Sequence, residues 1–239
     1  MNNQPMFCLR ALLMVMFLTG IDAVTVAIAD TTGAAFTREK QEAITHTEAL
    51  ELLKQGNERF FNGKTVKQNY SLQVQQTSTG QFPFATVVSC LDSRIPPAIV
   101  FDQGIGHLFV ARIAGNYVND DILGSLEFAT RLSGSKLIVV MGHTDCGAIK
   151  GACDAAQLGL LTATLANINP AVNAVQGSYV PRNSKNSKFV QDVAEMNVQL
   201  TLKKLRDRSV VLREMIDNGE IGLVGAMYDV SSGKVTFYE

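Results

Sequence analysis

The sequence predicts an α/β fold with a mainly parallel central sheet flanked by helices. Three short apolar runs rich in β-branched residues have the length of buried strands, at 84–89, 108–113 and 136–141. Helical patterns separate or follow these runs, and the clearest is an apolar stripe that follows an acidic start over 120–132. Strands that alternate with helices indicate parallel pairing, so we expect the carboxyl ends of these strands to meet at one edge of the sheet.

Further elements are predicted on either side of this segment. Apolar residues near helical spacing, followed by an Asn-Gly stop, predict a helix over 45–61. Residues 66–82 are polar, rich in Gln, Ser and Thr, and are interpreted as a long connection. Two more helices are predicted at about 188–206 and 209–218, and a hairpin is predicted around Ser232-Gly233.

Size and composition indicate one domain with a sizeable core. The 239 residues are 46% hydrophobic and 18% charged, an ordinary globular balance. The sequence contains no repeat, low-complexity tract or clear interdomain linker. The formal net charge of −1 gives no basis for a nucleic-acid or membrane-surface role. We therefore expect a single domain over 30–239 and no nucleic-acid partner.

The first thirty residues depart from this composition. An arginine precedes an apolar run over 11–18, and an Ala-Ile-Ala segment at 27–29 offers the small residues that a signal peptidase reads. A membrane anchor is the alternative, but Gly20 and Asp22 break the apolar stretch well short of the ~20 residues needed to span a bilayer. We interpret residues 1–29 as a secretory signal peptide. The protein should be exported, to a bacterial periplasm or the medium, with no stable membrane insertion after signal removal.

Residues suited to metal binding follow two of the predicted strands. Cys90 comes directly after the first strand, and His143 and Cys146 follow the third. In open α/β sheets, ligands bind beyond the carboxyl ends of the strands. Two thiolates and one imidazole are the ligand set of a catalytic zinc that leaves its fourth position for water. Gly142 and Gly147 are expected to let the backbone come close to this zinc site.

Two other interpretations of these residues stay open. Cys146 would act as a nucleophile with His143 as its base, or all three residues would be ordinary core residues. The segment Cys90-x-Asp92-x-Arg94 favours the metal site, because residues two apart in an extended segment point to the same side. An Asp–Arg pair keeps the carboxylate ionised and able to accept a hydrogen bond from a zinc-bound hydroxide. We expect Asp92 and Arg94 to be catalytic, with a surface ion pair as the alternative.

Several local motifs occur in order along the chain. They are Cys90-x-Asp92-x-Arg94, Gly106-x-x-Phe109-x-x-Arg112-x-x-Gly115-Asn116, Gly124-Ser125-Leu126-Glu127-Phe128-Ala129 and Gly142-His143-x-x-Cys146-Gly147. An early Gly56-Asn57-x-Arg59-Phe60 and a late Gly225-Ala226-Met227-Tyr228-Asp229 also fit. With these motifs in this order, the sequence resembles the β-class carbonic anhydrases from about residue 47 to residue 239.

The resemblance implies four parallel strands plus an antiparallel edge strand, with N-terminal helices that extend to a partner subunit in a homodimer or homotetramer. Carried over by position, Cys90, His143 and Cys146 bind Zn²⁺. Asp92 either pairs with Arg94 or becomes a fourth metal ligand in an inactive form. The implied enzyme is a zinc lyase, carbonic anhydrase, which reversibly hydrates carbon dioxide to bicarbonate and a proton by attack of zinc-bound hydroxide.

The chain departs from the common family pattern at His107, where an acidic residue is usual, and at Ile113, where asparagine is usual. We expect a structural role for His107, because it begins a predicted strand at the end opposite the metal site. Cys153 is expected to be a small core residue on the same helix face as Cys146. Two other functions stay as alternatives: hydrolysis of carbonyl sulfide or carbon disulfide, and non-catalytic binding of zinc or bicarbonate.

Overall fold

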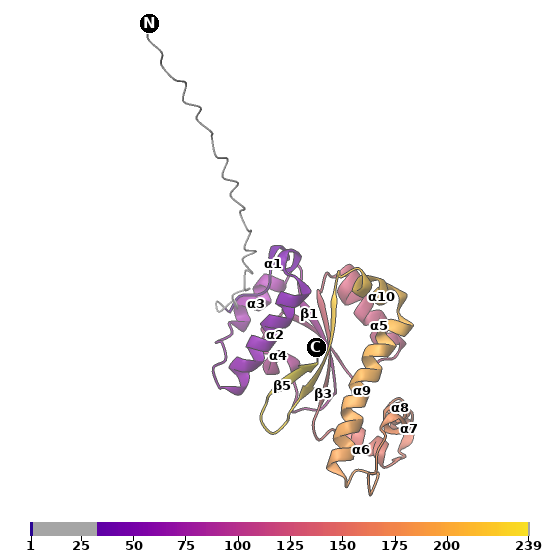
Figure 1. The fold of residues 1–239 in the computed structure, drawn as a ribbon. Helices are drawn as coiled ribbons and strands as arrows, with labels where there is room; N and C mark the ends of the chain where they lie inside the picture. The colour runs from indigo at the N-terminus through magenta and orange to yellow at the C-terminus, as the bar shows by residue number, and fades with distance from the viewer. Residues whose placement is uncertain (2–32, 239) are drawn as a thin grey trace.

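One sheet of five strands, in the order β2-β1-β3-β4-β5, forms the centre of the fold (Figure 1). The computed structural model describes residue 1 and residues 33–238, so the proposed signal peptide lies, except for Met1, outside the described residues. The strands are β1 Ala85–Ser89, β2 Leu108–Arg112, β3 Leu137–His143, β4 Gly222–Tyr228 and β5 Val235–Tyr238. The first four are parallel and β5 is antiparallel to β4, as expected.

The three strands predicted from apolar runs are confirmed as β1, β2 and β3. β1 and β3 lie side by side inside the sheet, and all of their residues are buried. Because helices cover both faces, these strands are continuously apolar instead of alternating between apolar and polar residues. β3 continues two residues beyond the predicted end and so includes His143 as its last residue.

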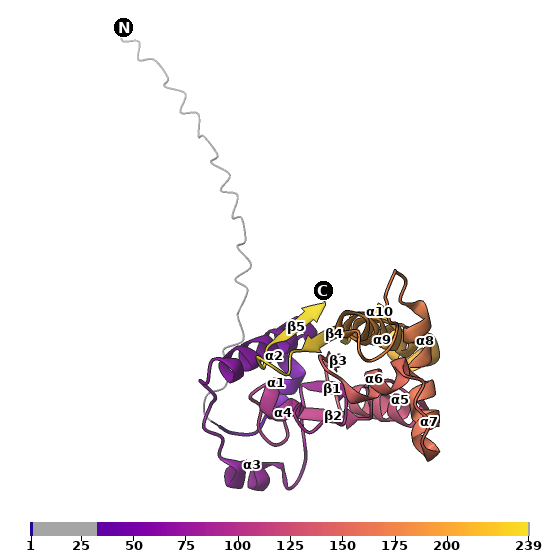
Figure 2. The same cartoon turned by 90° about the horizontal axis from the view of Figure 1, so that it is seen from below.

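Helices form a layer on each face of the sheet (Figure 1). The first layer contains α1 Arg38–Ala43, α2 His46–Phe61, α3 Tyr70–Thr77 and α4 Pro97–Val100. The second contains α5 Asp120–Glu127, α6 Gly147–Cys153, α7 Gly159–Ala166, α8 Asn169–Ala174, α9 Ser187–Arg208 and α10 Val210–Asp217. Figure 2 shows β2 and β5 at opposite edges of the sheet. Within the described residues, every helix is too short or too polar to cross a bilayer.

Helix α2 confirms the prediction over 45–61, and its sequence explains where it begins and how it packs. Thr45 and Glu48 form a reciprocal capping box at the start, in which each side chain accepts a hydrogen bond from the other residue's backbone N–H. The helix backbone then packs directly on the end of α4. A Cβ atom added at Gly56 would lie 1.9 Å from the carbonyl oxygen of Phe101, so only glycine fits there.

Two predictions for the helices differ from the structure. The expected connection over 66–82 contains α3, which begins at the Asn69 cap and is held by the buried side chain of Gln73. Gln73 Oε1 accepts a hydrogen bond from the backbone N–H of Ile105 at 2.9 Å, so polar contacts replace the apolar stripe on which the prediction relied. The helix expected over 120–132 is divided into two parts. The first is α5, and the second is a π-helical turn, Phe128–Leu132.

The other two predicted helices are confirmed as α9 and α10, and the predicted hairpin is the β4–β5 pair. The helix face expected to carry Cys146 and Cys153 corresponds to α6, whereas α7 and α8, over 159–174, were not predicted from the sequence. They are short, and α7 is nearly uniformly apolar, so no helical stripe distinguishes it.

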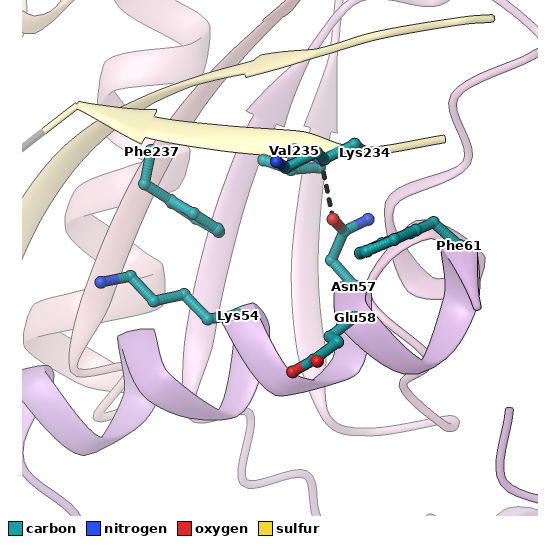
Figure 3. A pocket seen from close by; sticks show the side chains of 7 residues that line it. All are labelled: Lys54, Asn57, Glu58, Phe61, Lys234, Val235 and Phe237. Carbon is teal, nitrogen blue, oxygen red and sulfur yellow. Dashed lines mark hydrogen bonds between the residues drawn. The ribbon is translucent and has the colours of Figure 1, made fainter. Parts of the chain in front are cut away.

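A single side chain, Asn57, joins α2 to the edge of the sheet (Figure 3). Its amide nitrogen donates to the carbonyl oxygens of Val100 at 3.1 Å and Gly233 at 2.9 Å. Its carbonyl oxygen accepts a hydrogen bond from the backbone N–H of Val235 at 2.8 Å. Figure 3 shows Asn57 at the wall of a cavity of about 400 Å³ between α2 and β5. Asn57 itself is buried, so its side chain is the partner of three backbone groups that lie inside the fold.

We expect Asn57→Ala to destabilise the fold by about 3 kcal/mol, because it leaves buried backbone groups without partners. Chemical denaturation of the full chain measures this change. Gln55→Ala is the control, since Gln55 lies on the same helix and bonds only to Glu51. A loss no larger than that of the control would contradict the role of Asn57.

Candidate metal centre

Three side chains meet at the carboxyl end of the sheet, where β1 and β3 run side by side. Cys90 follows the last residue of β1, His143 ends β3, and Cys146 directly precedes α6. One sulfur or ring nitrogen from each of them lies within 4.8 Å of the other two, and all three side chains are buried. The structure therefore brings together the three predicted ligand residues as a group that could hold a metal ion.

The spacing of these atoms fits a tetrahedral metal ion. The Cys90 and Cys146 sulfurs are 3.9 Å apart. Two thiolates at ~2.3 Å from a tetrahedral zinc would be separated by about 3.8 Å. His143 Nδ1 lies 2.9 Å from the carbonyl oxygen of Thr144, to which it must donate because a carbonyl only accepts. His143 Nε2 is buried without a hydrogen-bond partner among the described residues, so its lone pair is available for a metal.

The two cysteines shift each other's pKa in opposite directions. The hydrogen bond from Cys146 outweighs burial and lowers the pKa of the Cys90 thiol. The same contact with Cys90, together with burial, raises the pKa of the Cys146 thiol. Among the described residues, His143 makes no hydrogen bond to Cys146, since its Nδ1 bonds to the Thr144 carbonyl oxygen and its Nε2 has no partner. The geometry therefore favours metal binding over the cysteine-hydrolase interpretation. The backbone N–H of Gly115, 3.4 Å from Cys90 Sγ, adds a donor to the charged sulfur.

Asp92 and Arg94 form the predicted pair beside these ligands. Arg94 donates from Nε to Asp92 Oδ1 at 3.0 Å and from Nη2 to Oδ2 at 2.7 Å. Hydrogen bonding from Arg94 holds the pKa of the Asp92 carboxyl well below its usual range. Asp92 Oδ2 lies 3.9 Å from His143 Nε2. Asp92 thus has the pair with Arg94, which is one of the two arrangements expected for it.

Arg94 is held on its other side by Asp145, which the sequence did not single out. Arg94 Nη1 lies 3.5 Å from Asp145 Oδ2, and Nη2 donates to the Asp145 carbonyl oxygen at 3.3 Å. Asp145 adopts a left-handed backbone conformation, with φ of 57°, and also pairs with Lys150. A cavity of about 450 Å³ borders Asp145 and Lys150 and reaches α9 at Lys188. Arg94 therefore lies between two carboxylates, which restricts its orientation.

Arg112 and Asn197 form hydrogen bonds to the backbone around the site. Arg112 donates to the carbonyl oxygen of Cys90 at 2.9 Å and to that of Asp92 at 2.5 Å. Asn197 Nδ2 donates to the carbonyl oxygen of Gly115 at 2.7 Å. The motif containing Arg112 was visible in the sequence, but its contacts were not. No sequence signal connects Asn197, in the middle of α9, with the site.

The glycines and the remaining predicted residues have mixed outcomes. A Cβ atom at Gly142 would lie 2.8 Å from Val198 Cγ2, so this glycine allows a close approach to α9, whereas a Cβ atom at Gly147 would have no described residue within 4 Å. The predicted approach of both glycines to the zinc site stays a prediction. His107 lies directly before β2, and its two ring nitrogens contact Gln103 and the Ala34 carbonyl, which fits a structural role. Cys153 is a buried core residue, as predicted.

The fold and the site together define an α/β metalloprotein class with a Cys-His-Cys ligand set at the carboxyl ends of two parallel strands. A family model described as carbonic anhydrase matches residues 85–235. Carbonic anhydrase 2 of Mycobacterium tuberculosis is 34% identical over 187 residues, which cover 78% of this chain and 89% of the relative. The carbonic anhydrase of Mycolicibacterium smegmatis is 32% identical over 188 residues, 78% of this chain and 90% of the relative.

A solved structure of a carbonic anhydrase also matches this chain. The β-carbonic anhydrase CafA of Aspergillus fumigatus has a TM-score of 0.60 and 29% sequence identity, and the match covers 70% of this chain and 80% of CafA. This chain belongs to the carbonic anhydrase family, in its β class. The family and the fold expected from the sequence motifs are thereby confirmed.

We expect Arg112→Lys to weaken metal binding about ten-fold, because lysine cannot bond both carbonyl groups that fix the Cys90–Asp92 segment. Competition with a chromophoric chelator for Zn²⁺ measures the affinity. Arg131→Lys is the matched control, since Arg131 forms only an exposed pair with Glu220 at 3.3 Å. Equal affinities in the two variants would exclude Arg112 from supporting the ligands.

Proposed function

We propose that this protein holds Zn²⁺ through Cys90, His143 and Cys146 and catalyses the reversible hydration of carbon dioxide to bicarbonate and a proton. The position of Asp92 carries this proposal: its carboxylate is paired with Arg94 yet lies 3.9 Å from His143 Nε2. A structural zinc site is closed by four protein ligands, whereas a catalytic site keeps one position for water. Three candidate ligands beside an already paired carboxylate fit the catalytic pattern.

The reaction divides between the metal and the chain's own residues. When bound, Zn²⁺ lowers the pKa of coordinated water to about 7 and so makes a nucleophilic oxygen available at neutral pH. Asp92 is placed to accept a hydrogen bond from the reacting water and to direct its lone pair toward the carbon of the substrate. Arg94 keeps that carboxylate ionised and fixes its direction. Asp145 in turn restricts Arg94.

The two alternative functions use the same residues differently. Carbonyl sulfide and carbon disulfide are linear molecules like carbon dioxide, so a hydrolase of either would need the same ligands and the same Asp92. A non-catalytic zinc or bicarbonate-binding protein would have no need for a carboxylate held ionised by Arg94 beside the ligands. The alternatives are therefore separated by assay of the three substrates.

Hydration of carbon dioxide by the zinc-loaded protein should be lost after chelation and restored by added Zn²⁺, because without the metal nothing lowers the pKa of the reacting water. A stopped-flow assay with a pH indicator measures this rate. Turnover of carbonyl sulfide or carbon disulfide without carbon dioxide hydration would favour the hydrolase. Zinc binding with no turnover of any of them would favour the non-catalytic function.

Two substitutions separate metal binding from catalysis. Cys146→Ser should lose most of the zinc, while Cys153→Ser, a change of the neighbouring buried thiol outside the ligand group, should keep it. Asp92→Asn should keep zinc, but the rate of hydration should fall about 100-fold or more. The neutral amide is a weaker hydrogen-bond acceptor for the reacting water than the carboxylate is. Zinc content and stopped-flow rates measure both effects. Asp217→Asn, at an exposed ion pair with Arg206, is the control, and full activity of Asp92→Asn would remove Asp92 from the mechanism.

We also propose that residues 1–29 are removed on export to a periplasm or the medium, and that residues 30–239 form a homodimer or homotetramer. Export is supported by the sequence pattern alone. Assembly is supported by the outer edge of β2, which pairs with no strand among the described residues. Val110 and Phe128 are 42% and 50% exposed near this edge, and exposed apolar side chains at a strand edge are typical of an interface.

A further inference from the structure

The orientation of the His143 ring is linked to the carbonyl oxygen of the next residue, Thr144. His143 Nδ1 donates to this oxygen at 2.9 Å. The ring nitrogen that donates decides where the lone pair lies, so this contact leaves the lone pair on the buried Nε2. If the carbonyl group turned away, the ring would lose this restraint. Whatever holds the Thr144 carbonyl group in place therefore also holds His143 in its ligand orientation.

Thr144 is joined to the segment at the end of β4 through both its backbone and its side chain. Its backbone N–H donates to the carbonyl oxygen of Tyr228, the last residue of β4, at 2.9 Å. Its hydroxyl accepts a hydrogen bond from the backbone N–H of Val230 at 3.0 Å. The hydroxyl proton is then left for Asp229 Oδ1, which lies 3.4 Å away. These contacts connect β3 to β4 directly beside the candidate ligand His143.

The Asp229 carboxylate is itself held by the turn between β4 and β5. Its Oδ1 accepts hydrogen bonds from the backbone N–H and the hydroxyl of Ser231, both at 2.8 Å. Its Oδ2 accepts a hydrogen bond from the Ser232 hydroxyl at 3.0 Å. The hydrogen bonds from Ser231 lower the pKa of the Asp229 carboxyl, and an ionised acceptor makes stronger hydrogen bonds than a neutral one. Asp229 is thus a fixed, charged acceptor for the Thr144 hydroxyl.

The residue after Thr144 is restrained as well. Asp145 has a left-handed backbone conformation, with φ of 57°, and its carbonyl oxygen accepts a hydrogen bond from Arg94 at 3.3 Å. The peptide group that carries the Thr144 carbonyl oxygen therefore lies between two restrained residues. The Thr144 hydroxyl is a restraint that a substitution removes without changing a candidate metal ligand or the Asp92–Arg94 pair.

We propose that Thr144 and Asp229 are positioning residues for the zinc site, and that their contact holds the carbonyl group that orients His143. They act through His143, since neither belongs to the Cys-His-Cys group of the described residues. This inference rests on the proposed function and adds to it two residues that the proposed reaction does not use. Loss of a hydrogen-bond partner of a metal-binding histidine typically weakens metal binding about 10-fold to 100-fold. Because Thr144 acts through its own backbone, we expect the lower end of this range.

Competition with a chromophoric chelator measures the Zn²⁺ affinity of the full chain and its variants. Thr144→Val removes the hydroxyl and should weaken zinc binding about ten-fold. Thr144→Ser keeps the hydroxyl and should stay within about two-fold of the unmodified chain. Thr164→Val is the matched control, since the Thr164 hydroxyl donates to the Leu160 carbonyl oxygen of its own helix, α7, at 3.3 Å. Equal affinities of Thr144→Val and this control would overturn the proposal.

Co²⁺ in place of Zn²⁺ gives a readout that a general loss of stability does not change. The visible absorption bands of a cobalt site with thiolate and imidazole ligands depend on the ligand geometry. Thr144→Val should shift these bands, whereas Thr144→Ser and Thr164→Val should leave them unchanged. Bands of Thr144→Val identical to those of the unmodified chain would show that His143 keeps its orientation without the hydroxyl, and would overturn the proposal.

A double variant tests whether the two residues act through one contact. Asp229→Asn makes the acceptor neutral and should weaken zinc binding about three-fold. The double variant with Thr144→Val should bind zinc within about two-fold of Thr144→Val alone, because the same contact is lost only once. Losses that multiply would remove Asp229 from the proposal. Zinc binding without hydration of carbon dioxide would contradict the proposed function alone, whereas the affinities and cobalt spectra decide this inference.

Discussion

The close approach of two buried sulfurs, 3.9 Å apart, is the constraint on which the rest of the site depends. A charged thiolate in a buried position is unfavourable by several kcal/mol unless donors or a cation compensate it. Gly115 provides one donor at Cys90, and its backbone φ of 85° is a conformation that glycine adopts without strain. A side chain there would also clash with Ile168, since a Cβ atom would lie 2.4 Å from Ile168 Cδ1. The backbone conformation and the contact with Ile168 therefore favour glycine at the position whose N–H bonds to the sulfur.

The same short segment positions both a ligand and the carboxylate. Arg112 bonds to the carbonyl oxygens of Cys90 and Asp92, so the backbone between them is fixed at two points. Asp92 then meets Arg94, two residues further on, through two side-chain hydrogen bonds. This local pairing explains why the carboxylate lies beside the ligand group without joining it. A change in the Cys90 backbone would move Asp92 with it.

Much of the fold and the site could be predicted from the sequence, for physical reasons that also limit the prediction. Parallel strands covered on both faces are continuous apolar runs, and the ends of those runs located Cys90 and His143. Helix α3 was missed because Gln73, the residue that holds it, makes its contacts by hydrogen bonds that leave no periodic signal. The open space at Gly147 could not be foreseen either, because it depends on what lies across from the glycine in the folded chain.

Helix α9 shows why such tertiary contacts matter for function. On one side Val198 packs so closely on Gly142 that a Cβ atom there would lie 2.8 Å away, which sets the position of the helix behind β3. One residue earlier, Asn197 bonds to the Gly115 carbonyl oxygen, and Gly115 donates to Cys90. Asn197 also lines, with Thr201, a cavity of about 320 Å³ between α8 and α9. Because protein interiors are close-packed, a displacement of this helix would be felt both at the cavity and at the thiolate. Asn197 is thus a buried polar residue whose side chain makes a hydrogen bond in a helix whose other buried positions are mostly apolar.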